Sequence, residues 1–78
     1  MLKMKMDGKV TQIEEKISKK GNEYVIVYIA QDGNWLRVMA HQDIENVVRK
    51  IEAGTSVSAV LKYNPKWKSF VLVAIEKR

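Results

Sequence analysis

The middle of the chain alternates hydrophobic residues with a period of two, which is typical of β-strands. Residues 24–30 read Tyr-Val-Ile-Val-Tyr-Ile-Ala, and residues 35–40 read Trp-Leu-Arg-Val-Met-Ala. Their β-branched and aromatic side chains favour extended backbone. The polar segment 31–34 between them predicts a tight connection. We therefore expect residues 24–40 to form an antiparallel hairpin.

Three further strands are expected on either side of this hairpin. Residues 4–17 alternate apolar and charged residues, but the apolar phase slips before Ile13. Such a slip predicts a bulge, and Gly8 is suited to a sharp bend. Residues 18–23 have the composition of a turn. Residues 56–63 and 70–75 predict two more strands, joined by a turn at residues 64–68.

One amphipathic helix is expected between the third and fourth strands. An apolar stripe at helical spacing is formed by Ile44, Val47, Val48 and Ile51. Asp43 is placed to act as the N-cap, and Gly54 to stop the helix. This order predicts one mainly-β domain, residues 1–78, folded as a five-stranded Greek-key barrel with an α-helix between strands 3 and 4. An SH3-like barrel explains the strands but explains such a helix less well.

The two faces of the hairpin differ in composition. One face is aliphatic and suits the barrel interior: Val25, Val27, Ile29, Leu36, Val38 and Ala40. The other face carries Tyr24, Ile26, Tyr28, Trp35, Arg37 and Met39. An outward surface with these rings predicts a contact site, in which Ile26 and Met39 are half-buried supports. Nucleobases stack on such rings, whereas a second copy of the chain or ordinary strand packing would also account for them.

Lysines cluster in two expected loops, so the positive charge of a chain with a formal net charge of +5 is not spread evenly. Lys16, Lys19 and Lys20 lie at the first turn, where Glu23 is the nearby downstream acid. Lys62, Lys66 and Lys68 surround Trp67 at the last turn. In a barrel of this type these loops flank strands 2 and 3, so they would hold phosphates at the margins of the aromatic face. Solvated loop lysines are the simpler explanation, and Trp67 either stacks on a base or folds back over the barrel rim.

Three short stretches carry a resemblance to a known family. They are Gly8-Lys9-Val10-Thr11-Gln12-Ile13, the segment Lys19-Lys20-Gly21-Asn22-Glu23-Tyr24-Val25-Ile26-Val27, and Gly54-Thr55-Ser56-Val57. In these the chain resembles the single-stranded-DNA-binding branch of the oligonucleotide-binding (OB) superfamily, as found in replication proteins. The resemblance implies that single strands are bound across strands 2 and 3. It places Tyr24, Tyr28, Trp35 and Arg37 where such proteins contact nucleic acid.

Little in the sequence supports catalysis. There is no cysteine and a single histidine, His41, which we expect to have a capping or surface role. No metal-ligand cluster or phosphate-binding glycine motif is present, so we expect neither a metal nor another cofactor. No apolar run reaches the length of a signal peptide or membrane span, and a cytoplasmic location is expected.

The expected function is binding of single-stranded DNA, with RNA as the alternative, at little sequence specificity. Bases would stack on Tyr24, Tyr28, Trp35 and Trp67, and phosphates would contact Arg37, Lys16, Lys19, Lys20, Lys66 and Lys68. The competing hypothesis is an adaptor or homodimerisation module that uses the same face without nucleic acid.

Overall fold

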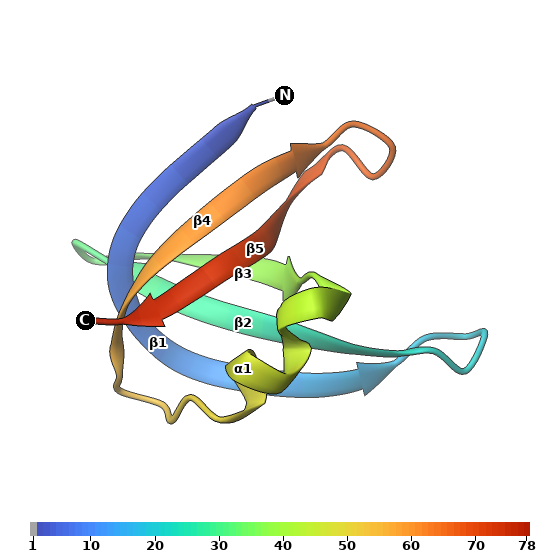
Figure 1. Ribbon diagram of the computed structural model, residues 1–78, viewed down its shortest axis with the longest axis horizontal. Coiled ribbons are helices and arrows are strands. Elements are labelled where there is room, and N and C mark those ends of the chain that lie inside the picture. Colours follow the sequence, from blue (N-terminus) through green and yellow to red (C-terminus); the bar gives the residue numbers. More distant parts are fainter. Residues whose placement is uncertain (1) are drawn as a thin grey trace.

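Five strands close into a barrel in the computed structural model, which describes residues 2–78 (Figure 1). The strands are β1 (Lys3–Ile17), β2 (Glu23–Gln31), β3 (Asn34–Ala40), β4 (Ser56–Asn64) and β5 (Ser69–Lys77). They are arranged around the barrel in the order β1-β2-β3-β5-β4. A helical segment lies between β3 and β4. Strand order and helix position together are those of the OB fold, as the sequence predicted.

β1 is long because it pairs with two different strands. Residues 3–9 pair with β4, and residues 9–17 pair with β2. The predicted bulge is confirmed, and the register shift lies between Val10 and Gln12. Gly8 is needed for a different reason: a Cβ there would lie 2.5 Å from the carbonyl oxygen of Ala30. The absence of a side chain at Gly8 therefore lets β1 pass close to β2 where β1 changes partner.

β2 and β3 form the predicted hairpin. Gln31 pairs with Asn34, and the two residues between them have φ values of 48° at Asp32 and 82° at Gly33. Positive φ at both central positions is the mark of a type I′ turn, whose twist matches that of the strands. β3 then meets β5 in a short parallel pairing, Met39 with Val71 and Ala40 with Leu72. That pairing closes the barrel.

The barrel interior contains the aliphatic face of the hairpin. Val25, Val27 and Ile29 are fully buried, and Val38 and Ala40 are nearly so, while Leu36 is half-buried against them. The other strands and the helical segment complete this core with Val10, Val48, Ile51, Val57, Ala59, Leu61, Leu72 and Ile75. The predicted interior positions are thus confirmed.

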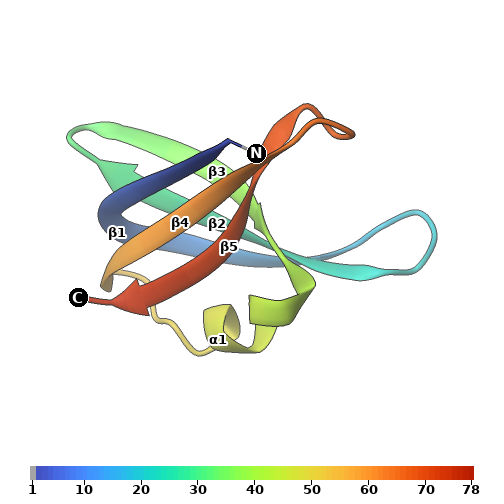
Figure 2. The same cartoon turned by 45° about the horizontal axis from the view of Figure 1, so that its top comes forward.

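The helical segment is shorter than predicted. It consists of a 3-10 turn, η1 (Gln42–Ile44), followed by α1 (Glu45–Arg49), and it packs against one end of the barrel (Figure 2). The N-cap of η1 is His41, whose Nδ1 accepts a hydrogen bond from the backbone N–H of Asp43 at 3.2 Å. The prediction of Asp43 as N-cap is therefore wrong, and the capping role of His41 is confirmed.

The end and the apolar face of this helix also differ from the prediction. α1 ends at Arg49, before Gly54, whose φ of 94° belongs instead to the turn into β4. Val48 and Ile51 are buried, whereas Val47 is 50% exposed. The apolar stripe that touches the barrel is therefore narrower than the sequence pattern indicated. Within residues 2–78, no helix has the length and apolar character needed to cross a bilayer.

Candidate nucleic-acid interface

The outer surface of the sheet carries a row of apolar side chains. Backbone register joins Ile26 on β2 to Met39 on β3, and Met39 to Val71 on β5. Each alternates along its strand with a residue of the core, so the three face outwards. Ile26 is only 4% exposed and Val71 only 5%, while Met39 is half-buried. The half-buried position predicted for Met39 is confirmed. Ile26 is more deeply buried than predicted, since it lies between β1 and β3, where it pairs with Glu14 and Met39.

An aromatic pair lies beside this row, towards the β2–β3 turn, and Trp35 is its exposed member. Trp35 is 67% exposed, and its ring centroid lies 5.6 Å from that of half-buried Tyr28, with the planes at 45°. Arg37 pairs with Tyr28 across the strands, and its Nε donates to the Tyr28 hydroxyl oxygen at 3.2 Å. The structure thus brings three predicted site residues together. They present one open indole face and one guanidinium.

Glu14 is a member of this surface that sequence reasoning missed. It pairs with Ile26 on the outward row, and its carboxylate lies 3.8 Å from Lys16 Nζ. A hydrogen bond from Tyr28, aided by the charges of Lys16 and Arg37, holds the pKa of Glu14 below its ordinary value despite an opposing effect of partial burial. A carboxylate therefore stays ionised among cationic groups. Its place depends on the β1–β2 register, which the sequence pattern does not reveal.

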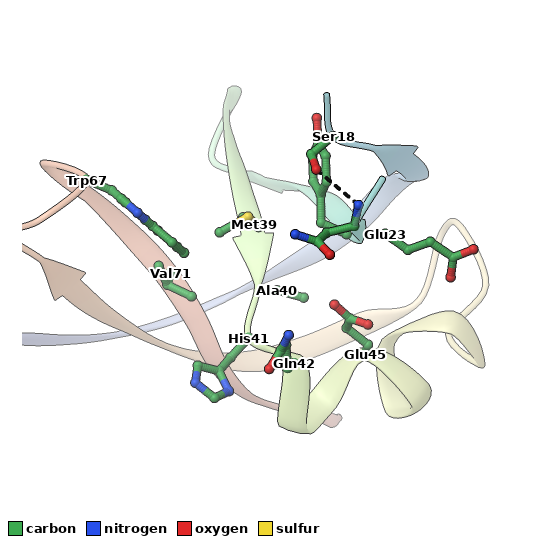
Figure 3. Close-up of a pocket in the computed structure, with 11 residues that line it drawn as sticks. Ser18, Glu23, Met39, Ala40, His41, Gln42, Glu45, Trp67 and Val71 are labelled. Atoms are coloured by element: carbon green, nitrogen blue, oxygen red, sulfur yellow. Dashed lines mark hydrogen bonds between the residues drawn. The ribbon is translucent and has the colours of Figure 1, made fainter. Parts of the chain in front are cut away.

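A hollow of about 720 Å³ opens at the other end of the row (Figure 3). Met39 and Val71 lie at its base, Trp67 stands on one side, and Ser18 and Glu23, at the two ends of the β1–β2 turn, lie on the other. Tyr24 of β2 also lines it. A smaller hollow of about 330 Å³ shares His41, Trp67 and Val71 with it. Trp67 is therefore accessible beside two concave surfaces.

The loop that carries Trp67 is held by its own hydrogen bonds. The side-chain oxygen of Asn64 accepts from the backbone N–H of Lys66 at 2.9 Å and from that of Trp67 at 3.4 Å. Trp67 is 54% exposed, so its ring is not part of the barrel core. Trp67 and Val71 line the same two hollows of the outer surface.

The predicted lysines are distributed along the margins of this surface. Lys16 pairs with Tyr24 across β1 and β2, while Lys19 and Lys20 lie exposed in the β1–β2 turn. Lys66 and Lys68 are exposed in the β4–β5 turn. The two loops thus lie on opposite sides of the larger hollow.

The lysines of the two loops have no ion-pair partner in the described part of the chain and are available to bind an anion. Arg49 of α1 lies near three carboxylates: Glu15 at 3.2 Å, and Glu23 and Glu45 at 3.8 Å each. Glu23, the acid nearest to the first lysine cluster in sequence, is therefore directed to Arg49. Among residues 2–78, no carboxylate lies within 4 Å of Lys19, Lys20, Lys66 or Lys68. The described residues contain no group of three His, Asp or Glu placed to hold a metal ion.

Comparison with solved structures finds the same barrel in a mitochondrial single-stranded-DNA-binding protein of Saccharomyces cerevisiae, Rim1. One crystal form superposes with a TM-score of 0.78 at 19% identity, covering 99% of this chain and 93% of Rim1. A second form gives a TM-score of 0.67 at 21% identity, covering 97% and 94% of the two chains. The sequence matches no family model and no curated protein sequence. At these identities the comparison establishes a shared fold, the OB barrel.

Proposed function

We propose that this protein binds single-stranded DNA on the outer surface of β2, β3 and β5, with little sequence specificity and without catalysis. The observation that carries the proposal is the 67% exposed indole of Trp35, which lies against Tyr28 on a surface flanked by unpaired lysines. Every base has a flat π-face, and stacking on an aromatic ring contributes about 1–3 kcal/mol per base.

The residues divide into two roles in this proposal. Bases stack on the rings of Tyr24, Tyr28, Trp35 and Trp67, and the strand's phosphates meet the positive groups of Arg37, Lys16, Lys19, Lys20, Lys66 and Lys68. The apolar row of Ile26, Met39 and Val71 supports the bases between the two ends of the surface. The shared fold with Rim1, which is by name a single-stranded-DNA-binding protein, supports this assignment.

Titration with matched oligonucleotides tests the proposal. We expect a thymidine oligonucleotide to quench tryptophan fluorescence, because both indoles are exposed at the proposed surface. Affinity should fall with salt, with a log–log slope of about −0.7 for each phosphate contact. A duplex of equal length hides its base faces and should bind more weakly. An RNA strand of the same length shows whether the sugar matters.

Two results would contradict the proposal. An affinity that does not change with salt concentration would show that the lysines do not contact the phosphates of the strand. A stable homodimer that ignores every oligonucleotide in sedimentation experiments would favour the adaptor hypothesis, in which a second copy covers the aromatic surface.

A further inference from the structure

We propose that the larger hollow is a pocket for one unstacked base of the bound strand, whose edge is recognised by the carboxamides of Asn22 and Gln42. This inference rests on the proposed function, because the strand must lie on the outer surface for a base to reach the hollow. It adds a subsite that reads the edge of one base to a surface on which the other bases stack whatever their sequence.

The shape of the hollow suits a flat, partly apolar group. Its base is formed by Met39 and Val71, and the Trp67 ring stands at its side (Figure 3). Its volume of about 720 Å³ lies within the range of about 300–1,000 Å³ usual for small-molecule sites. Because Met39 and Val71 belong to the same row as Ile26, the hollow is continuous with the stacking surface.

The side-chain carboxamides of Asn22 and Gln42 line the hollow. The hydrogen bond that Asn22 donates to Ser18 Oγ, at 3.1 Å, comes from its backbone N–H and not from its side chain. Within residues 2–78, neither the Asn22 nor the Gln42 carboxamide makes a hydrogen bond. A carboxamide offers a donor beside an acceptor, and this pair matches the adjacent acceptor and donor on the edge of a base.

The charges around the hollow favour a base over a phosphate. No lysine or arginine is among the described residues that line it, whereas Glu23 and Glu45 are. Both carboxylates lie 3.8 Å from Arg49, which also pairs with Glu15, so one cation is shared by three acids. A phosphate would be repelled there and attracted to the lysines of the two flanking loops. The backbone of the strand is thus expected at the rim, with one base turned inwards.

The test compares a normal strand with one that lacks bases. Binding of octathymidylate and of an abasic octamer with the same phosphates is measured by fluorescence anisotropy, at low salt where phosphate contacts alone give measurable affinity. We expect Gln42→Ala to weaken octathymidylate binding about fivefold, which is the lower end of the range for a pair of hydrogen bonds to one base. The affinity for the abasic octamer should not change. Asn22→Ala should act in the same way.

Asn46→Ala is the matched control, because Asn46 is an exposed carboxamide on α1 that does not line the hollow. It should change neither affinity. The pocket is refuted if Gln42→Ala and Asn22→Ala leave octathymidylate binding intact, or weaken both strands equally. If the unaltered protein binds neither strand, the proposed function itself fails, and the pocket with it.

Discussion

Trp35 is the side chain on which the stacking hypothesis depends most directly. Its ring is 67% exposed and contacts Tyr28, so removal of the ring leaves the core intact. We expect Trp35→Ala to weaken single-stranded DNA binding by about 1–3 kcal/mol, and to change the free energy of unfolding by less than about 0.5 kcal/mol. Oligonucleotide titration and urea unfolding measure the two effects. Loss of the folded state would instead make Trp35 a structural residue.

Glu14 places a negative charge inside a surface that is proposed to hold phosphates. Glu14→Gln removes this charge and keeps an oxygen that accepts from Tyr28. We expect the variant to bind single-stranded DNA more tightly at low salt, and the difference to shrink as salt screens the charge. Anisotropy at two salt concentrations measures it. Weaker binding by the variant would show that the carboxylate itself contacts the strand.

The same residue makes a prediction about pH. Because the pKa of Glu14 is lowered in the folded protein, its ionised form stabilises the fold at pH values above the pKa of an unfolded glutamate. That contribution is lost as the pH falls from this ordinary value through the lowered one. Glu14→Gln should therefore have a smaller loss of stability than the unaltered protein over this acidic interval, measured by urea unfolding.

At the scale of elements, α1 stabilises the barrel through a narrow contact. Val48 is fully buried in the core, whereas its neighbour Val47 is 50% exposed. We expect Val48→Ala to lower the free energy of unfolding by about 2 kcal/mol, because it removes buried apolar volume. Val47→Ala is the matched control and should cost less than about 0.5 kcal/mol. Equal effects in urea unfolding would mean that both side chains pack against the barrel.

The β4–β5 turn makes a second prediction at this scale. Replacing both Lys66 and Lys68 by glutamine should weaken binding and reduce the steepness of the log–log salt dependence by up to about 1.4, or 0.7 for each lost phosphate contact. The control pair carries the same charge but lines neither hollow: Lys50 follows α1, and Lys77 pairs with Val57 at the end of β5 opposite the β4–β5 turn. Equal changes in both pairs would show that net charge, rather than position, governs binding.

These elements differ in how far the sequence predicts them. The β2–β3 hairpin follows from local chemistry alone, since alternation assigns its two faces and Asp32-Gly33 forms the turn. The ends of the helix cannot be predicted from local sequence in this way, because the chain after β3 first forms a 3-10 turn capped by His41. Glu14 was missed for a related reason. Its position beside Tyr28 depends on strand pairing between distant segments, which no local pattern encodes.

On the scale of the whole molecule, several acidic residues pair with two arginines rather than with the lysines of the turns. Arg49 lies within reach of three carboxylates near the helix, and Arg78 lies 3.5 Å from Asp7. The lysines of the β1–β2 and β4–β5 turns have no such partner among the described residues. Both turns thus carry lysine charge that no described carboxylate within 4 Å offsets, which is what the proposed phosphate contacts need.

Binding and folding should be coupled, because the proposed surface spans β2, β3, β5 and two loops that come together only in the closed barrel. A ligand held by the folded chain alone, at about one hundred times its Kd, stabilises that chain by about 2.7 kcal/mol. For a domain of this size we expect the Tm to rise by on the order of 10 °C or more with single-stranded DNA. Calorimetry measures the shift.

Two controls show whether the rise in Tm depends on base stacking at the aromatic surface. Trp35→Ala at the same oligonucleotide concentration should show a smaller rise, because each tenfold loss of affinity removes about 1.4 kcal/mol of the stabilisation. Duplex DNA of equal length and concentration should raise the Tm less than the single strand, because its bases are not free to stack on Trp35. An equal rise with both nucleic acids would mean that the lysines bind phosphate wherever it is offered, and that the aromatic surface plays no part in recognition.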